Sequence, residues 1–259
     1  MKAQQGIALI SVLLIMALAL LLTASLLRNH RLLLHSSGQQ IQYLELRQWA
    51  LAGEHWARQQ LPLGLFVPVN LSQPWATARV PFVPPGGTLA VEIEDLAGRY
   101  NLNAAIVSGL RLPGLELPKQ PLSRGLSGLS EWSGLEPSVA QAWQSRLALL
   151  PTHAGLNLNT ASQAALQLHG LPPATAATLL AQRPVEGYRS VQAFLAQPLA
   201  QGLGLTAQGL SLSSLWFQVR VRVVLGQRQL LLASDFELDR KTRQARLVQR
   251  RLWPGEALP

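Results

Sequence analysis

Hydrophobic residues fill the chain over residues 7–27 with few interruptions. The polar side chains inside this run are Ser11, Thr23 and Ser25, and the first charge after it is Arg28. As a helix, with about 1.5 Å of rise per residue, the run would be roughly 30 Å long, which matches the hydrocarbon core of a bilayer. The pattern therefore predicts a membrane-spanning helix.

The hydrophobic pattern becomes amphipathic after Arg28. If the helix continues over residues 28–60 at about 100° per residue, its apolar side chains fall within one arc. The arc contains Ile41, Leu44, Trp49, Ala52 and Trp56. Pro62 and Gly64 predict the end of the helix. We therefore expect one long helix whose second half packs on a globular head.

Alternating apolar and polar positions predict strands on both sides of the middle of the chain. Residues 88–95 and residues 217–223 alternate with a period of two. Gly226-Gln227 then predicts a hairpin turn into a strand at 229–239. Residues 245–252 alternate less regularly and predict a third C-terminal strand. Together these strands predict a small antiparallel sheet.

Acidic side chains on the strand at 229–239 are a candidate cation site. Asp235, Glu237 and Asp239 are two residues apart, so they share one face of the strand. They can hold a cation, or they can pair with Arg220 and Arg222 across the hairpin. Because opposite charges commonly pair across strands, we expect the ion pairs.

The middle of the chain, residues 104–210, has the composition of helices. Ala, Leu and Gln dominate, and β-branched residues are few. The clearest predicted helices are 139–149 and 161–168, and Asn103 is a plausible N-cap for a helix that begins at Ala104. We expect a helical domain inserted between the first strand and the others.

Gly6 lies between a short polar leader, which carries Lys2, and the apolar run. This arrangement resembles the precursors of type IV pilins and of the pseudopilins of bacterial type II secretion. In that family a prepilin peptidase cuts after the glycine on the cytoplasmic side and methylates the new N-terminal amine. The resemblance implies cleavage between Gly6 and Ile7, with N-methylation of Ile7.

Ser11 is the fifth residue after this cut, where most members of the family carry a glutamate. A carboxylate inside a bilayer is costly unless it finds a partner, and in the family that partner is thought to be the terminal amine of the neighbouring subunit. The K-type minor pseudopilins characteristically lack the glutamate. Ser11 therefore implies a subunit with no neighbour above it.

Two polar phrases also resemble K-type minor pseudopilins. The first is Asp-x-x-Gly-x-aromatic-Asn-Leu-Asn, in which the glycine permits a tight turn, and the second is a further Asn-Leu-Asn. The residues that carry this resemblance are Asp95, Gly98, Asn101, Asn103, Asn157 and Asn159.

The resemblance implies an α+β, pilin-like fold: a long N-terminal helix packed on a small antiparallel β-sheet, with a large inserted helical domain. It divides the chain into a leader peptide that is removed (1–6), a transmembrane and assembly helix (7–27), an amphipathic continuation (28–60), a pilin-like α/β domain (61–103 and 211–259) and an inserted helical domain (104–210).

The implied function is that of a minor pseudopilin of the type II secretion system. Such a protein is a non-enzymatic structural subunit at the tip of the periplasmic pseudopilus, where it helps to initiate assembly and supports export of folded proteins across the outer membrane. The implied partners are the I- and J-type minor pseudopilins, other pseudopilins, the prepilin peptidase and inner-membrane lipid.

The implied location is the inner membrane, crossed once. The N-terminus is cytoplasmic before cleavage and the C-terminal domain is periplasmic. Basic residues next to a membrane span usually lie on its cytoplasmic side. Arg28 and Arg31 follow the apolar run and Lys2 is the single basic residue before it, so the charges do not favour a cytoplasmic N-terminus. The orientation therefore comes from the resemblance alone.

Calcium is known in some members of the family, but its ligands do not transfer to this chain. The segment after Ile106 lacks the acidic, Tyr-containing insertion that is usual in the family, and clustered acids are few there. We therefore expect neither a metal nor another cofactor.

Composition excludes several classes of site. The 259 residues contain no cysteine, which excludes disulfides, a thiolate nucleophile and a Cys-ligated metal. The five histidines form no HExxH motif, and neither a Gly-x-Ser-x-Gly elbow nor a phosphate-binding Gly-rich loop is present. Catalysis is therefore not expected.

Positive charge is concentrated near the C-terminus. The net charge of +9 suits an anionic partner. The basic residues that crowd the end of the chain are Arg240, Lys241, Arg243, Arg246, Arg250 and Arg251. They form either a solvated strand edge or a surface for an exported protein or a partner subunit.

Residues 157–197 support an alternative function, that of a membrane-tethered DNA-binding protein. The sequence around Gly170 resembles the helix-hairpin-helix, in which a Gly-apolar-Gly turn offers backbone N–H groups to a phosphate. Pro172 replaces the second glycine and has no N–H to donate, so nucleic acid is not the expected partner. Arg183 and Arg189 keep the alternative open.

Two plainer interpretations of the apolar run also remain. A secretory signal cut near Ala19 would have a shorter apolar core than this run, which continues to Leu27. An ordinary membrane anchor without an assembly role requires length and apolarity alone, and it differs from a pseudopilin in its processing.

Overall fold

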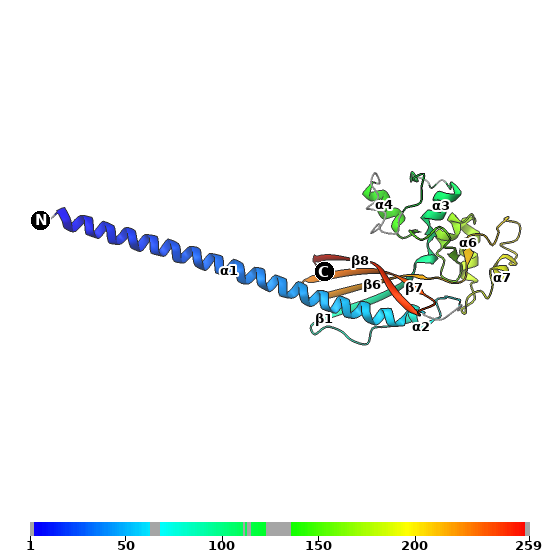
Figure 1. Cartoon of the computed structure of the whole chain (residues 1–259), viewed down its shortest axis with the longest axis horizontal. Coiled ribbons are helices and arrows are strands. Elements are labelled where there is room, and N and C mark those ends of the chain that lie inside the picture. The colour runs from blue at the N-terminus through cyan, green and yellow to red at the C-terminus, as the bar shows by residue number, and fades with distance from the viewer. Residues whose placement is uncertain (1–2, 63–67, 111, 113–114, 123–135, 257–259) are drawn as a thin grey trace. The chain divides into compact units, whose positions relative to one another are not determined.

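A computed structural model describes residues 3–62, 68–110, 112, 115–122 and 136–256. The chain forms two compact units, residues 1–48 and residues 49–259. One helix, α1 (Ala3–Gln60), belongs to both (Figure 1). It ends two residues before Pro62, as predicted, whereas Gly64 lies outside the described residues.

The first unit is the N-terminal part of α1. Its segment Val12–Arg31 has 20 residues with a mean hydropathy of 2.0. Among the helices of the described residues, this segment is the one that is long and apolar enough to cross a membrane. Its leucines are more than half exposed, as expected of a surface that lipid or other helices would cover. The segment fits a single membrane anchor.

The second unit contains a four-stranded antiparallel sheet in the order β1-β6-β7-β8 (Figure 1). The strands are β1 (Gly87–Asp95), β6 (Trp216–Leu225), β7 (Arg228–Asp239) and β8 (Gln244–Glu256). β1 and β6 are neighbours although residues 96–215 separate them along the chain, and Asp95 is the direct cross-strand partner of Phe217. The inserted segment therefore leaves the sheet and returns to it at one point.

The last turns of α1 pack on one face of this sheet because alternate strand residues give that face a continuous apolar surface. Val219, Val221 and Val223 of β6 are fully buried on it. Gly53 of α1 allows close approach, since a Cβ added there would lie 2.8 Å from the side chain of Val221. The predicted packing of a helix on a small antiparallel sheet is confirmed.

A buried ionic cluster joins this part of α1 to β7 and β8. Glu54 is 6% exposed, and its carboxylate accepts hydrogen bonds from Arg250 Nε at 2.6 Å, from Arg250 Nη2 at 2.5 Å and from Ser234 Oγ at 2.5 Å. Ser234 and Arg250 are cross-strand partners. The bidentate pair fixes the position of the helix along the sheet as well as its rotation.

The opposite, outer face of the sheet carries most of the strand charges. Arg220 of β6 lies 2.9 Å from Glu94 and 3.5 Å from Glu92, both on β1. Glu94 also accepts two hydrogen bonds from Arg99, each at 2.6 Å. The carboxylates of β1 are therefore the partners of Arg220.

The predicted pairing of the β7 acids with Arg220 and Arg222 is consequently wrong. Asp235 pairs with Arg251 at 2.9 Å, and Glu237 pairs with Arg246 at 2.9 Å, so β8 supplies the cations. The predicted face was right, but Arg220 lies closer to the acids of β1 than to those of β7.

A β-bulge in β8 explains its irregular sequence pattern. Leu247 faces Phe236 and Gln249 faces Asp235, so Val248 is an extra residue without a cross-strand partner. The bulge shifts the alternation by one position, and Arg246 and Arg251 therefore share the outer face. The strand runs from Gln244 to Glu256, beyond the predicted limits of 245–252.

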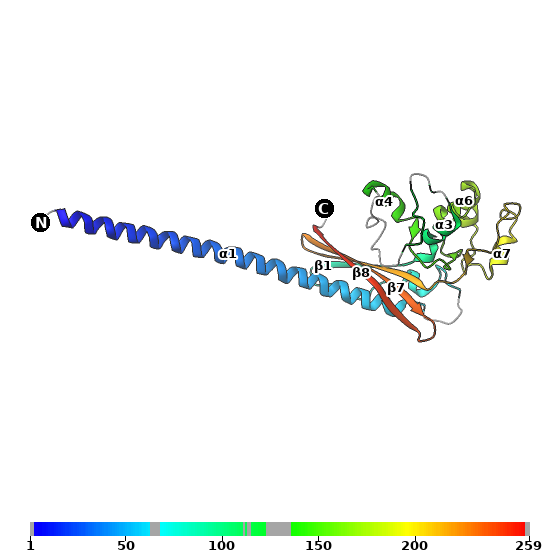
Figure 2. The same ribbon diagram turned by 45° about the horizontal axis from the view of Figure 1, so that its top comes forward.

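The segment between β1 and β6 contains several short helices joined by longer turns and loops, and it gathers at one end of the sheet (Figure 2). Two short parallel strand pairs, β2 with β3 and β4 with β5, hold it together. Its elements are η1 (Leu96–Gly98), β2 (Tyr100–Asn101), α3 (Leu102–Ser108), α4 (Pro137–Gln144), β3 (Leu147–Ala148), β4 (Leu156–Asn157), α5 (Gln163–Leu168), α6 (Pro173–Ala181), α7 (Val191–Leu195) and β5 (Leu210–Ser211). A further short helix, α2 (Pro74–Thr77), precedes β1. The predicted domain limits, 104–210 among them, stay a prediction.

Three details of the helical prediction need correction. The helix predicted over 161–168 begins at Gln163, and its N-cap is Ser162, whose Oγ accepts the N–H of Ala165 at 3.2 Å. The helix predicted over 139–149 ends at Gln144, because Leu147–Ala148 pair with β2 as strand β3. The helix predicted to begin at Ala104 begins at Leu102, and its N-cap is Asn101, whose Oδ1 accepts the N–H of Asn103 at 3.1 Å.

Candidate functional site

The predicted processing positions lie near the start of α1. Gly6, Ile7 and Ser11 are all helical. The backbone conformation tests neither cleavage nor N-methylation, so these remain predictions.

The six residues of the polar phrases lie where the inserted segment joins the sheet, and Asp95 is the central group. This carboxylate, at the end of β1, is 3% exposed. Its Oδ1 accepts from Ala97 N at 2.9 Å, and its Oδ2 accepts from Asn157 Nδ2 at 2.7 Å and Thr160 Oγ1 at 2.6 Å. Ser214 is a further hydrogen-bond partner. Burial raises the pKa of Asp95, although all these bonds favour its charged form.

Gly98 allows two segments to touch at this junction. A Cβ at this position would lie 2.6 Å from the carbonyl oxygen of Thr160, and the N–H of Ser162 donates to Gly98 O at 3.0 Å. Gly98 does not have a positive φ. The tight turn that the sequence predicted is present, since Leu96–Gly98 form a one-turn 3-10 helix in which Arg99 N donates to Leu96 O at 3.2 Å. Because any residue can adopt the φ of Gly98, the glycine is needed for the close backbone approach.

The first Asn-Leu-Asn phrase, residues 101–103, joins its own segment to Leu122 and to residues 150–154. Asn101 Nδ2 donates to Pro151 O at 2.8 Å, while its Oδ1 accepts the N–H of Asn103. Asn103 then binds both polar groups of Leu122, since its Oδ1 accepts from Leu122 N at 2.7 Å and its Nδ2 donates to Leu122 O at 3.0 Å. Leu102, between the two asparagines, is fully buried.

The second Asn-Leu-Asn phrase repeats this arrangement. Asn157 Oδ1 accepts the N–H of Asn159 at 3.1 Å, and Asn157 Nδ2 donates to Val69 O at 3.1 Å as well as to Asp95. Asn159 Oδ1 accepts from Tyr188 N at 2.6 Å, and its Nδ2 donates to Tyr188 O at 3.4 Å. In each phrase the first asparagine makes an Asx-turn and the second binds both backbone groups of a distant residue.

Arg183 belongs to the same network, a role that the sequence did not indicate. Its Nη1 donates to Asn159 O at 3.1 Å and its Nη2 donates to Ala161 O at 2.6 Å. Burial lowers the pKa of Arg183. The side chain therefore caps backbone carbonyls and does not extend toward a phosphate.

The turn between α5 and α6 is also poorly suited to phosphate. Gly170 N donates to Gln167 O at 3.0 Å and Leu171 N donates to Leu166 O at 3.1 Å. Pro172 has no N–H. The helix-hairpin-helix turn thus offers no free backbone donor from its Gly-Leu-Pro positions, whereas Arg189 is exposed.

The network has the character of a structural junction. Its carboxylate, amides and guanidinium are bonded to one another or to backbone groups, and within the described ranges no three His, Asp or Glu side chains gather as metal ligands would. Sequence reasoning found the asparagines through their phrases, but it missed Thr160, Ser214 and the backbone partners.

The sequence and the fold are both similar to those of type II secretion proteins. The family model described as "Type II secretion system (T2SS), protein K" matches residues 156–213, which include the second Asn-Leu-Asn phrase. The type II secretion system protein K of Pseudomonas aeruginosa is 27% identical over 297 aligned positions, covering 91% of this chain and 89% of that protein.

A solved structure has the same fold. It is a chain in the crystal structure of the GspK-GspI-GspJ complex from the enterotoxigenic Escherichia coli type 2 secretion system. The TM-score is 0.66 at 21% identity, and the match covers 85% of this chain and 99% of that chain. The pilin-like α+β fold expected from the sequence is confirmed.

Proposed function

Because this chain is a relative of protein K of bacterial type II secretion systems, we propose that it is a K-type minor pseudopilin. The observation that carries the proposal is the similarity to protein K over 91% of the chain. The fold supports it. The end of a long, N-terminally apolar helix packs on a four-stranded sheet, and the chain between the adjacent strands β1 and β6 forms an insertion that contains helices.

The subunit acts at the tip of the pseudopilus, in complex with I- and J-type minor pseudopilins. The solved relative comes from a complex with GspI and GspJ, and this chain has the same fold. Ser11 supports the end position, because a subunit without an acid there makes no contact with the amine of a subunit above it. The insertion has its own buried core, and such a bulky head is difficult to repeat around a tightly packed shaft.

The protein works by assembly and not by catalysis. It helps to start the pseudopilus and so supports export of folded proteins. Its α1 helix anchors it in the inner membrane, with the N-terminus cytoplasmic before prepilin peptidase cuts between Gly6 and Ile7, and with the C-terminal head in the periplasm.

A deletion strain tests the function. We expect loss of type II export, and rescue by the full-length chain but not by a variant that lacks residues 1–27. The affinity-tagged full-length chain, solubilised in mild detergent, should co-purify with the I- and J-type pseudopilins of the same system. Normal export without the gene, together with no co-purification, would contradict the proposal.

The mature N-terminus tests the processing. We expect N-terminal sequencing to begin at N-methylated Ile7 in cells with prepilin peptidase, and at Met1 in cells without it. Gly6→Val should block cleavage, since the family peptidase cuts after glycine. A mature chain that begins near Ala19 would instead identify a secretory signal.

DNA binding is the remaining alternative, and the geometry of Arg183 and of the α5–α6 turn argues against it. A DNA-binding protein would retain duplex DNA with an affinity that falls steeply with salt. We expect the detergent-solubilised chain to show no salt-sensitive retention of duplex DNA. We expect the Arg189→Ala variant to give the same result.

A further inference from the structure

One row of side chains crosses the outer face of the sheet from strand to strand. Ala90 of β1 faces Arg222 of β6, Arg222 faces Leu231 of β7, and Leu231 faces Trp253 of β8. Side chains directly opposite each other on antiparallel strands have Cβ atoms about 4.5–5.5 Å apart. These four residues, called here the Arg222–Trp253 row, therefore form one continuous strip of surface.

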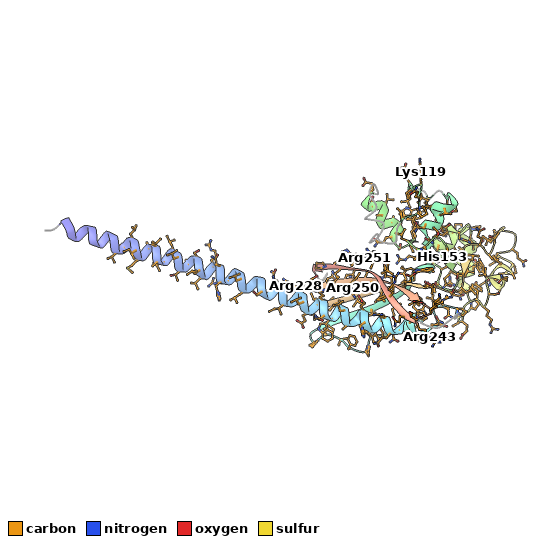
Figure 3. The ribbon with its side chains drawn as sticks, viewed as in Figure 1. Lys119, His153, Arg228, Arg243, Arg250 and Arg251 are labelled. Atoms are coloured by element: carbon orange, nitrogen blue, oxygen red, sulfur yellow. The ribbon has the colours of Figure 1, made fainter. Side chains whose placement is uncertain are left out.

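The next row along the strands consists of Glu92, Arg220, Ala233 and Arg251. The positive charges of this row are already paired with carboxylates of the sheet. Arg220 is paired with Glu92 and Glu94, and Arg251, which is also labelled in Figure 3, is paired with Asp235. New anions would have to displace these carboxylates. That row is therefore a poor candidate for binding a partner.

The Arg222–Trp253 row is different because its cation is free. Arg222 is exposed, and in the part of the chain that the structure describes it makes neither a hydrogen bond nor an ion pair. Trp253 is 45% exposed, and the guanidinium of Arg251 lies 5.8 Å from its ring centroid, which helps to hold the indole on the surface. Leu231 is partly exposed between them.

Arginine and tryptophan, together with tyrosine, are enriched among the residues that carry the binding energy of protein interfaces. Scattered exposed hydrophobic side chains are normal, but here an aromatic side chain, an aliphatic one and an unpaired cation are adjacent on rigid strands. A membrane surface would instead require a cluster of about four to eight basic residues. One free arginine beside one indole fits a contact with a protein.

We propose that the Arg222–Trp253 row is the docking surface for a neighbouring pilin-like subunit, which presents a carboxylate to Arg222 and an aliphatic side chain to Trp253. This inference rests on the proposed function and specifies the surface through which the head meets its partner. The carboxylate follows from the charge of Arg222, and the aliphatic group from the exposed face of Trp253 and Leu231.

The test uses the full-length chain in mild detergent with the I- and J-type pseudopilins of the same system. Arg222→Glu and Trp253→Ala should each weaken association at least tenfold, and Arg222→Lys should retain most of it. Arg189→Glu, a charge reversal on an exposed arginine of the insertion, should bind as the wild type does. Melting temperatures of all variants should agree, which excludes unfolding as the cause.

The outcomes separate the two proposals. If the wild type binds and Arg222→Glu and Trp253→Ala bind equally well, the docking surface is wrong while the proposed function stands. If the wild type binds neither pseudopilin, the proposed function itself is contradicted. If association with phosphatidylglycerol vesicles depends on Arg222 and association with the pseudopilins does not, the row is a lipid contact and the proposal is overturned.

Discussion

Asn103 and Asn159 each bind the N–H and the C=O of one distant residue. A side-chain amide can do this because it carries an acceptor and a donor in one plane, like a peptide group. A single asparagine thus replaces a short stretch of β-ladder. The two asparagines hold loops that the α3 and α5 helices alone would not fix.

Replacement of one amide by a carboxylate tests this role. In Asn159→Asp an acceptor oxygen faces the buried Tyr188 carbonyl, so we expect the free energy of unfolding to fall by about 2–3 kcal/mol. Asn103→Asp should cause a similar loss at Leu122. Urea denaturation followed by tryptophan fluorescence measures both. Gln208→Glu, an exposed control, should lie within about 0.5 kcal/mol of the wild type, and an Asn159→Asp midpoint equal to that of this control would refute the role.

Asp95 gives the fold a specific pH dependence. Because burial raises its pKa above the ordinary value of 3.8, the folded chain keeps the proton at pH values where the unfolded chain has released it. Its contribution to stability is therefore complete below that value and is lost as the pH rises through the raised pKa. Asp239, whose pKa is lowered chiefly by the N–H of Lys241, acts in the opposite sense.

Asp95→Asn isolates this contribution, since Asp239 titrates equally in both proteins. We expect the stability of the wild type relative to Asp95→Asn to decline as the pH is raised from below the ordinary pKa of 3.8, as a raised acid pKa requires. Equilibrium urea unfolding across this range measures the difference. A difference that is constant with pH would show that Asp95 titrates normally.

Sequence reasoning located the polar residues but not their partners. Asp95 and the asparagines were found because the phrases that contain them resemble those of K-type minor pseudopilins. The groups that they bind, such as the backbone of Tyr188 or of Leu122, have no side-chain signature. The same limit applied to Arg183. It was considered for a phosphate contact, because the sequence does not distinguish a buried arginine that binds backbone carbonyls from an exposed one.

At the scale of elements, the attachment of α1 to the sheet depends on one buried acid. Arg250→Met would leave the Glu54 carboxylate buried with the Ser234 hydroxyl as its one donor among those described above. Because an uncompensated buried charge is costly, we expect a loss of about 3 kcal/mol in the free energy of unfolding.

The matched control removes the charge altogether. Glu54→Leu combined with Arg250→Met should be less destabilised than Arg250→Met alone, since no ion stays buried. Urea unfolding of the two variants gives the comparison. If the double variant is the less stable, the pair contributes net stability and the desolvation argument fails.

Elements with a regular period were predictable, and irregular ones were not. Residues 217–223 of β6 alternate without interruption, so the buried valines could be read directly from the sequence. β8 did not alternate regularly because the extra residue Val248 changes which face follows it, and a bulge has no simple sequence signature. The helix over 139–149 was overestimated because strand β3, two residues long, pairs only in the folded chain.

At the scale of the whole molecule, side-chain amides join distant segments of the insertion. Residues 104–210 contain four glutamates and no aspartate, whereas calcium sites take several carboxylate oxygens. We propose that the protein is independent of calcium, and we expect its melting temperature to be the same within about 1 °C in excess EDTA and in millimolar calcium. A calcium-dependent rise in melting temperature would reveal a site that this composition does not suggest.

The point at which the chain leaves and regains the sheet has a wider consequence. Asp95 and Phe217 face each other directly, as the two residues that flank a reverse turn do in an ordinary hairpin. Topologically, then, everything from residue 96 to residue 216 occupies the place of a turn, and an Asn-Gly dipeptide is the connection such a register prefers. A miniaturised protein closed in this way would keep its anchor and all four strands. The four-stranded sheet and the insertion are in this sense topologically separable, because removal of the insertion would leave the order of the four strands unchanged.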